Sequence, residues 1–123
     1  MKTHAFQGLV SLHSDDTSDG FYGYANGATY TQSLLEPVLV AAEQLLPRNR
    51  NDFIDGFSAR NGIITSGFDG MLSAHPQKHP RPFEIVLETP HAAPQYLQEQ
   101  ALLAALSTVL AQYRMFIAYA SNL

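Results

Sequence analysis

The segment from about residue 94 to residue 119 constrains the fold of this 123-residue chain most strongly, because its apolar side chains point in nearly every direction. One helical face carries Leu97, Ala101, Ala104, Ala105, Val109, Phe116 and Ala120, and a second stripe carries Leu102, Leu106, Tyr113 and Ile117. A helix that is apolar all round has to be covered on both sides. Its most apolar run, residues 101–111, is shorter than the roughly 20 residues of a membrane span. The segment therefore predicts a buried helix.

Strand patterns precede this helix. Alternation of apolar and polar residues with a period of two predicts strands at residues 4–12 and 83–88. Asn26-Gly27, flanked by aromatic and β-branched residues, predicts a hairpin across residues 20–31 with a type I′ turn. A second Asn-Gly pair predicts another hairpin, whose strands would span residues 55–60 and 63–68.

A first helix is predicted between the two hairpins. Apolar residues recur with helical spacing from Ser33 to Leu46, Ser33 and Glu36 form a capping-box pattern, and Pro47 ends the helix. The resulting order, βββ-α-βββ-α, favours an α+β fold in a single domain spanning residues 1–123. We expect an antiparallel sheet of five or six strands with both helices mainly on one face. The other face would be open, with tyrosines on it.

Composition excludes several classes of protein. The absence of cysteine excludes disulfides and thiolate chemistry, and it fits a cytoplasmic protein. The net charge is −4 and the seven Lys and Arg residues are scattered, which argues against nucleic acid as a partner. Only 15% of the residues are charged, below the usual ~25%. Few charges and the apolar C-terminal helix together predict a homodimer, and no membrane association is expected.

The segment H-S-D-D-T-S-D-G-F-Y-G-Y-A-N-G, residues 13–27, is the strongest candidate for a functional surface. Carboxylates on a loop can steer a partner and set the association rate, while tyrosines on a hairpin can supply buried contact area. The predicted function is therefore a non-enzymatic module that binds another protein, of the accessory, inhibitor, antitoxin or immunity type. The candidate binding residues are His13, Asp15, Asp16, Asp19, Tyr22, Tyr24 and Tyr30.

Other kinds of site remain open on the sequence. The carboxylates of the loop lack the closing glutamate of an EF-hand. Prolines interrupt the helical spacing of His75 and His79, so neither a metal nor a cofactor is expected. No nucleophile-elbow or nucleotide-binding motif is present. The alternative function is a small-molecule-binding protein or an enzyme, with histidine and aspartate as acid and base in a cleft between the sheet and the C-terminal helix. Whether His75, His79 and His91 form a site is left open.

Overall fold

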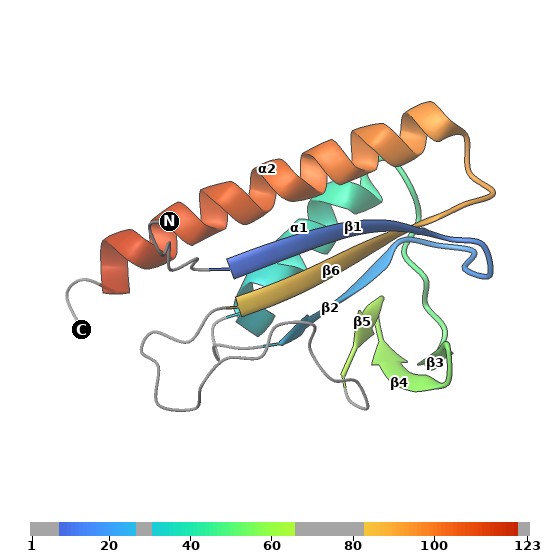
Figure 1. The fold of residues 1–123 in the computed structure, drawn as a ribbon, viewed down its shortest axis with the longest axis horizontal. Helices are drawn as coiled ribbons and strands as arrows, with labels where there is room; N and C mark the ends of the chain where they lie inside the picture. Colours follow the sequence, from blue (N-terminus) through green and yellow to red (C-terminus); the bar gives the residue numbers. More distant parts are fainter. Residues whose placement is uncertain (1–7, 27–30, 66–82, 121–123) are drawn as a thin grey trace, which may run out of the picture.

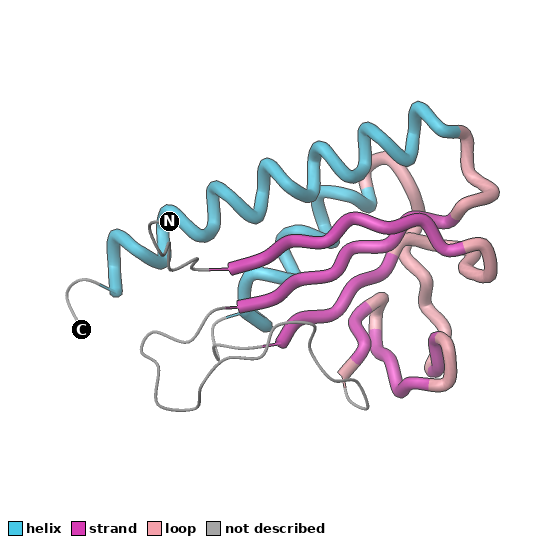
Figure 2. Tube along the Cα trace, in the orientation of Figure 1, coloured by secondary structure: helices cyan, strands magenta, loops and turns pink. Residues whose placement is uncertain are grey.

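The structure is a six-stranded mixed sheet with two helices packed on one of its faces (Figures 1 and 2). This computed structural model describes residues 8–26, 31–65 and 83–120. The sheet has the order β1-β6-β2-β5-β4-β3. The elements are β1 (Gly8–Asp15), β2 (Tyr22–Asn26), α1 (Thr31–Glu43), β3 (Phe53–Ile54), β4 (Phe57–Arg60), β5 (Ile63–Ile64), β6 (Phe83–Pro90) and α2 (Gln95–Ala120). The α+β class is thus confirmed, and the order of the described elements, ββ-α-ββββ-α, roughly matches the predicted one.

The sheet is mixed, which corrects the prediction of an antiparallel sheet. β6 lies between β1 and β2; it is parallel to β1, from the pair Gly8–Phe83 to the pair Asp15–Pro90, and antiparallel to β2. β2 is also parallel to β5. Period-two patterns identify strands but do not specify their partners, and parallel partners are joined by long crossovers that a turn motif cannot reveal.

The predicted hairpin at Asn26-Gly27 is described only in its first strand, β2, and at Thr31. β2 pairs with β6 on one edge and with β5 on the other, and Thr31 already begins α1. The expected turn residue Gly27 and residues 28–30 lie outside the described residues. Close packing of β2 against its neighbour explains Gly23, because a Cβ there would lie 2.7 Å from the Val86 carbonyl oxygen.

The second hairpin is confirmed, and a further strand precedes it. β4 and β5 are antiparallel and join at Asn61-Gly62, whose φ angles are 52° and 81°. Asp55-Gly56 has the same left-handed geometry, with φ angles of 51° and 83°, and joins β4 to the short β3. Both pairs fit a turn with positive φ at its two central residues. Residues 66–68 of the predicted hairpin lie outside the described part.

Helix α1 begins earlier than predicted, so Ser33 lies within it and is not its cap. Pro37 is inside the helix. Glu36 instead forms an ion pair with the buried Arg48, at 2.9 Å, and Arg48 also contacts Glu43 at 3.2 Å and the Asn61 carbonyl oxygen at 3.0 Å. This guanidinium ties α1 to the β4–β5 turn.

The main core lies between the sheet and the two helices. Its fully buried residues include Phe21 from the strand side, Leu35 and Leu39 from α1, and Ala105 and Val109 from α2. The opposite side of α2 is exposed, with Leu103 at 58% and Met115 at 52% exposure. The prediction that α2 is covered on both sides is therefore not met by the described part of this chain. No helix in that part is long and apolar enough to cross a membrane.

Candidate functional site

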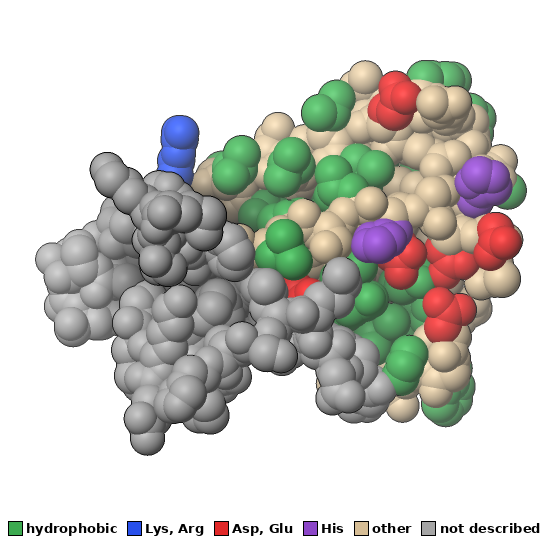
Figure 3. Space-filling view, viewed as in Figure 1, with side chains coloured by type: hydrophobic (Ala, Val, Ile, Leu, Met, Phe, Trp, Pro, Cys, Tyr) green, Lys and Arg blue, Asp and Glu red, His purple; other side chains and the backbone are tan. Residues whose placement is uncertain are grey.

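Four polar side chains meet on the open face of the sheet, which is the face opposite the helices. They are Asp15 at the end of β1, Tyr22 at the start of β2, Glu88 near the end of β6, and Asp55 in the β3–β4 turn. We call them the carboxylate–tyrosine cluster. In the space-filling view, acidic side chains gather beside a histidine on this face (Figure 3). The carboxyl ends of parallel strands, such as those of β1 and β6, are a common place for ligand sites in α/β sheets.

The backbone around the cluster is held by local contacts. The Thr17 backbone N–H and hydroxyl both donate to Asp15 Oδ1, at 2.8 Å each, and turn the chain directly after β1. The loop that follows β1 is also held by Asn49, whose side chain donates to the Ser18 hydroxyl at 2.9 Å. Asp55 reaches the cluster because the left-handed turn brings it back over β2.

The Tyr22 hydroxyl lies at the centre of the cluster, and its side chain is completely buried. It is 2.6 Å from Asp15 Oδ2, 2.8 Å from Glu88 Oε2 and 3.2 Å from Asp55 Oδ2. A phenol has one proton and can donate one such bond. The single Tyr22 proton therefore faces three carboxyl oxygens, of which Asp15 Oδ2 is the nearest.

The pKa values of these groups are shifted by burial, by hydrogen bonds and by the neighbouring charges. Burial raises the pKa of Glu88, and the charges of Asp15 and Asp55 raise it further, while Tyr22 and His13 partly oppose the increase. Burial acts to raise the pKa of Asp15 as well, but the hydrogen bonds from Tyr22 and Thr17 outweigh it, so that this pKa is lowered. Burial, with the bonds to Asp15 and Glu88, raises the pKa of Tyr22. The Tyr22 hydroxyl therefore acts as a donor toward the carboxyl oxygens, with its shortest bond to Asp15.

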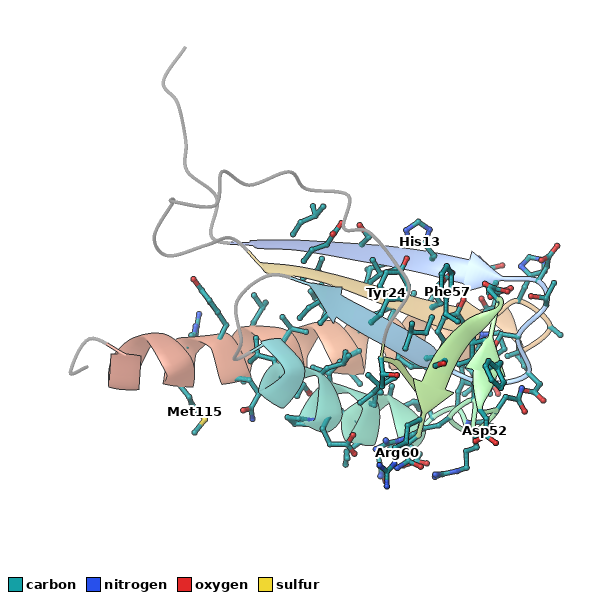
Figure 4. All side chains as sticks on the ribbon, turned by 90° about the horizontal axis from the view of Figure 1, so that it is seen from below. His13, Tyr24, Asp52, Phe57, Arg60 and Met115 are labelled. Atoms are coloured by element: carbon teal, nitrogen blue, oxygen red, sulfur yellow. The ribbon has the colours of Figure 1, made fainter. Side chains whose placement is uncertain are left out.

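His13 completes this edge of the open face. It is the register partner of Glu88 across the parallel pair, it is exposed, and it stands on the side of the sheet away from the helices (Figure 4). The arrangement provides an accessible imidazole beside a half-buried carboxyl whose pKa is raised. That combination is typical of acid–base chemistry.

A second polar group lines an open pocket of about 550 Å³ between the ends of β1 and β6 and the start of α2. Gln98 Nε2 donates to the carbonyl oxygens of His91 and Ala93, so its Oε1 accepts from Thr89 at 2.9 Å and from Ser14 at 3.0 Å. Because the Ser14 proton is committed to Gln98, Ser14 accepts from His91 Nδ1, at 3.1 Å. In a serine nucleophile activated by histidine, the serine donates its proton to the histidine, so the direction of the hydrogen bond here is the reverse.

The predicted site residues are therefore distributed over different environments. Asp15 and Tyr22 are brought together in the cluster, and Tyr22 is inaccessible to a partner. His13, Asp16 and Asp19 are exposed, and Tyr24 packs beside Ile54 and Ile64. Tyr30, His75 and His79 lie outside the described residues.

Two cluster members, Asp55 and Glu88, were missed by sequence reasoning. Glu88 lies on the same face as Glu84 and Val86 in the alternating segment F-E-I-V-L-E. Asp55 precedes a glycine, as Asn61 does in the second Asn-Gly pair. Both signals were available, but nothing in the sequence connects them to Asp15. Among the residues that the structure describes, no three His, Asp or Glu side chains are arranged to hold a metal ion.

Comparison with known proteins identifies the fold. No known protein family matches the sequence, and no curated protein does. Crystal structures with the same fold come from Shewanella amazonensis (19% identity), Shewanella denitrificans (23%) and Shewanella baltica (20%), and each is described as a putative metallopeptidase. Each has a TM-score of 0.70 and is matched over 86% of this chain. The chain spans only 40–41% of the length of these proteins.

At this identity the similarity shows a shared fold and not a shared activity. It nevertheless contradicts the prediction of a non-enzymatic binding module of the accessory, inhibitor, antitoxin or immunity type, because the proteins that share the fold are described as putative metallopeptidases. The alternative prediction located acid–base residues in the cleft beside the C-terminal helix. The carboxylate–tyrosine cluster, with its short hydrogen bonds, lies instead on the open face of the sheet.

Proposed function

We propose that this chain carries the acid–base part of a hydrolase that acts on peptide or related amide bonds, with Glu88 as the proton-transferring group. The observation that carries the proposal is the position of the Glu88 carboxyl, 2.8 Å from the Tyr22 hydroxyl and adjacent to His13 at the carboxyl ends of β1 and β6. The fold shared with proteins described as metallopeptidases supports the reaction class.

The residues of the cluster would divide the work. Glu88 would take a proton from the attacking water and deliver it to the leaving amine, as general bases and acids do in amide hydrolysis. Tyr22, held by Asp15, would keep the Glu88 carboxyl in one orientation. The exposed His13 would contact the substrate from the adjacent strand. The buried position of Tyr22 supports a positioning role for it, because it cannot itself reach a substrate.

The described residues do not by themselves fit a metal centre. Their carboxylate oxygens are engaged by Tyr22 and Thr17, and they offer no set of three converging ligands. A peptidase metal site of the zinc type uses three protein ligands. The proposal therefore assigns proton transfer to this chain and assigns no step to a metal. A cytoplasmic location, compatible with the lack of cysteine, is part of the same proposal.

Hydrolysis of a quenched fluorescent peptide mixture by the full chain, with and without added Zn²⁺, tests the proposal. Glu88→Gln should lower kcat by about 100-fold or more, in line with the loss of a general acid–base group. Asp16→Asn is the matched control, because it neutralises an exposed carboxylate nearby and should leave the rate unchanged. Absence of hydrolysis under both conditions, or equal rates for Glu88→Gln and the native chain, would contradict it.

A further inference from the structure

The free edge of β1 is a surface that the described residues leave uncovered. β1 is the first strand in the sheet order, so one of its edges has no partner strand in the described part of the chain. Its eight residues, G-L-V-S-L-H-S-D, pair with β6 in unbroken register and contain neither lysine nor proline. Edge strands are normally protected by short length, charge, proline or a bulge. The opposite edge strand, β3, is protected because it has only two residues.

A second uncovered surface is a leucine stripe on α2, formed by Leu103, Leu106 and Leu110. These residues follow the three- and four-residue spacing of a helix–helix seam. Leu103 and Leu110 are 58% and 57% exposed. Leu12 of β1, which is 44% exposed, lines an apolar groove with Leu103 and Leu106. The stripe and the strand edge thus form one continuous surface.

The ends of the stripe carry opposite charges. Glu99 lies one turn before Leu103, and Arg114 lies one turn after Leu110. A second α2 placed antiparallel, with a two-fold axis between Leu106 and Ser107, would put Leu103 opposite the partner's Leu110. The same alignment would put Glu99 opposite the partner's Arg114. The stripe is therefore complementary to itself both in shape and in charge.

The strand edge accepts the same symmetry. A two-fold axis at Ser11 would pair β1 with its copy in an antiparallel arrangement and place Val10 opposite the partner's Leu12. Antiparallel pairing keeps each side chain on its own face of the sheet. The exposed Leu12 would then contact an apolar neighbour on the helix side of the sheet.

One axis satisfies both requirements. β1 and α2 run in opposite directions (Figure 1), and Ser14 bonds Gln98 at 3.0 Å. Ser11 lies about 10 Å back along the strand, a distance that corresponds to about seven residues along the helix. The strand axis at Ser11 therefore falls beside Ala105 of α2. Along the helix this is about 2 Å from the axis between Leu106 and Ser107 that the leucine stripe requires.

We propose that a second copy of this chain binds along the β1 edge and the leucine stripe, joining two six-stranded sheets into one continuous sheet across a two-fold axis. An isologous interface of this kind uses the same patch on both copies. A stable interface buries more than about 1,000 Å², and strand pairing and helix packing would both contribute to this area.

Sedimentation velocity of the full chain from 1 to 100 μM tests the proposal. We expect a dimer of twice 13.5 kDa to predominate in the upper part of this range. Leu103→Glu should weaken dimerisation by at least 100-fold, because it places two carboxylates in the seam. Met115→Glu is the matched control, since Met115 is 52% exposed on another side of α2, and it should dimerise normally. A monomer at 100 μM, or a dimer unaffected by Leu103→Glu, would overturn the proposal.

Charge reversal tests the alignment. Glu99→Arg or Arg114→Glu alone should weaken the dimer several-fold, because each brings like charges together in two symmetric contacts. The double variant should dimerise within about twofold of the native chain. Far-UV circular dichroism confirms that each variant is folded. Failure of the double variant to restore dimerisation would overturn the antiparallel alignment.

Discussion

Substitution of Tyr22 by Phe isolates the role of one buried hydroxyl. The ring would keep its packing against Ile54 and Ile64, so the change should create no cavity. The variant loses the 2.6 Å bond donated to the ionised Asp15, and a bond to a charged group contributes about 1.5–3 kcal/mol. It also loses the 2.8 Å bond that the hydroxyl donates to Oε2 of the half-buried Glu88 carboxyl. We therefore expect the free energy of unfolding to fall by about 2–4 kcal/mol.

Thermal unfolding measures this loss directly. An unfolding entropy of about 2.1 cal/mol/K per residue gives roughly 0.26 kcal/mol/K for a chain of 123 residues, so each kcal/mol shifts Tm by about 4 °C. Tyr22→Phe should lower Tm by about 8–16 °C. Tyr96→Phe, at a side chain that is 66% exposed, should shift it by less than about 2 °C. A Tyr22→Phe shift as small as that of the control would refute the central position of the hydroxyl.

Three further predictions concern other contacts. Glu88→Gln should gain stability over the native chain as pH rises: the raised pKa means that the proton stabilises the folded state below the unfolded pKa, and this contribution is lost as pH rises through the folded pKa. In thermal melts between pH 4 and pH 8, the Tm of Glu88→Gln minus the Tm of the native chain should therefore increase with pH. A constant difference would contradict the raised pKa of Glu88. Gly23→Ala should cost more than about 2 kcal/mol in urea unfolding, because its Cβ would meet the Val86 carbonyl, whereas Gly56→Ala, with open space but positive φ, should cost about 1 kcal/mol. Arg48→Met should cost about 2 kcal/mol or more by removing the cation between two glutamates, and a neutral result would show that these ion pairs contribute no stability.

Local signals in the sequence were reliable where the structure depends on local contacts. The turn at Asn61-Gly62 and the long C-terminal helix follow from backbone chemistry and from periodicity within one segment. For the hairpin expected at Asn26-Gly27, the structure describes only β2, which pairs with β6 and, at Gly23, with β5. Turn propensity is a local preference, and it does not specify which strands pair in a sheet.

The candidate site was only partly predictable for the same reason. Asp15 and Tyr22 are seven residues apart and were recognised together, whereas Glu88 comes from a strand 66 residues beyond Tyr22. The alternating pattern of the segment that contains Glu88 predicts a strand and indicates which face of the strand the glutamate occupies. It does not show that this strand lies between β1 and β2, and the cluster depends on that placement.

The central position of β6 has a consequence for biosynthesis. β1 pairs residue 8 with residue 83, and β2 also needs β6, so neither strand has its main partner until the later part of the chain has been translated. At about 5–20 residues per second, β1 waits for roughly 4–15 s after it is made. During that time the nascent chain presents an unpaired apolar strand to chaperones and to neighbouring polysomes. Yield in a heterologous host should therefore depend on translation speed and chaperone supply more than on the stability of the finished fold.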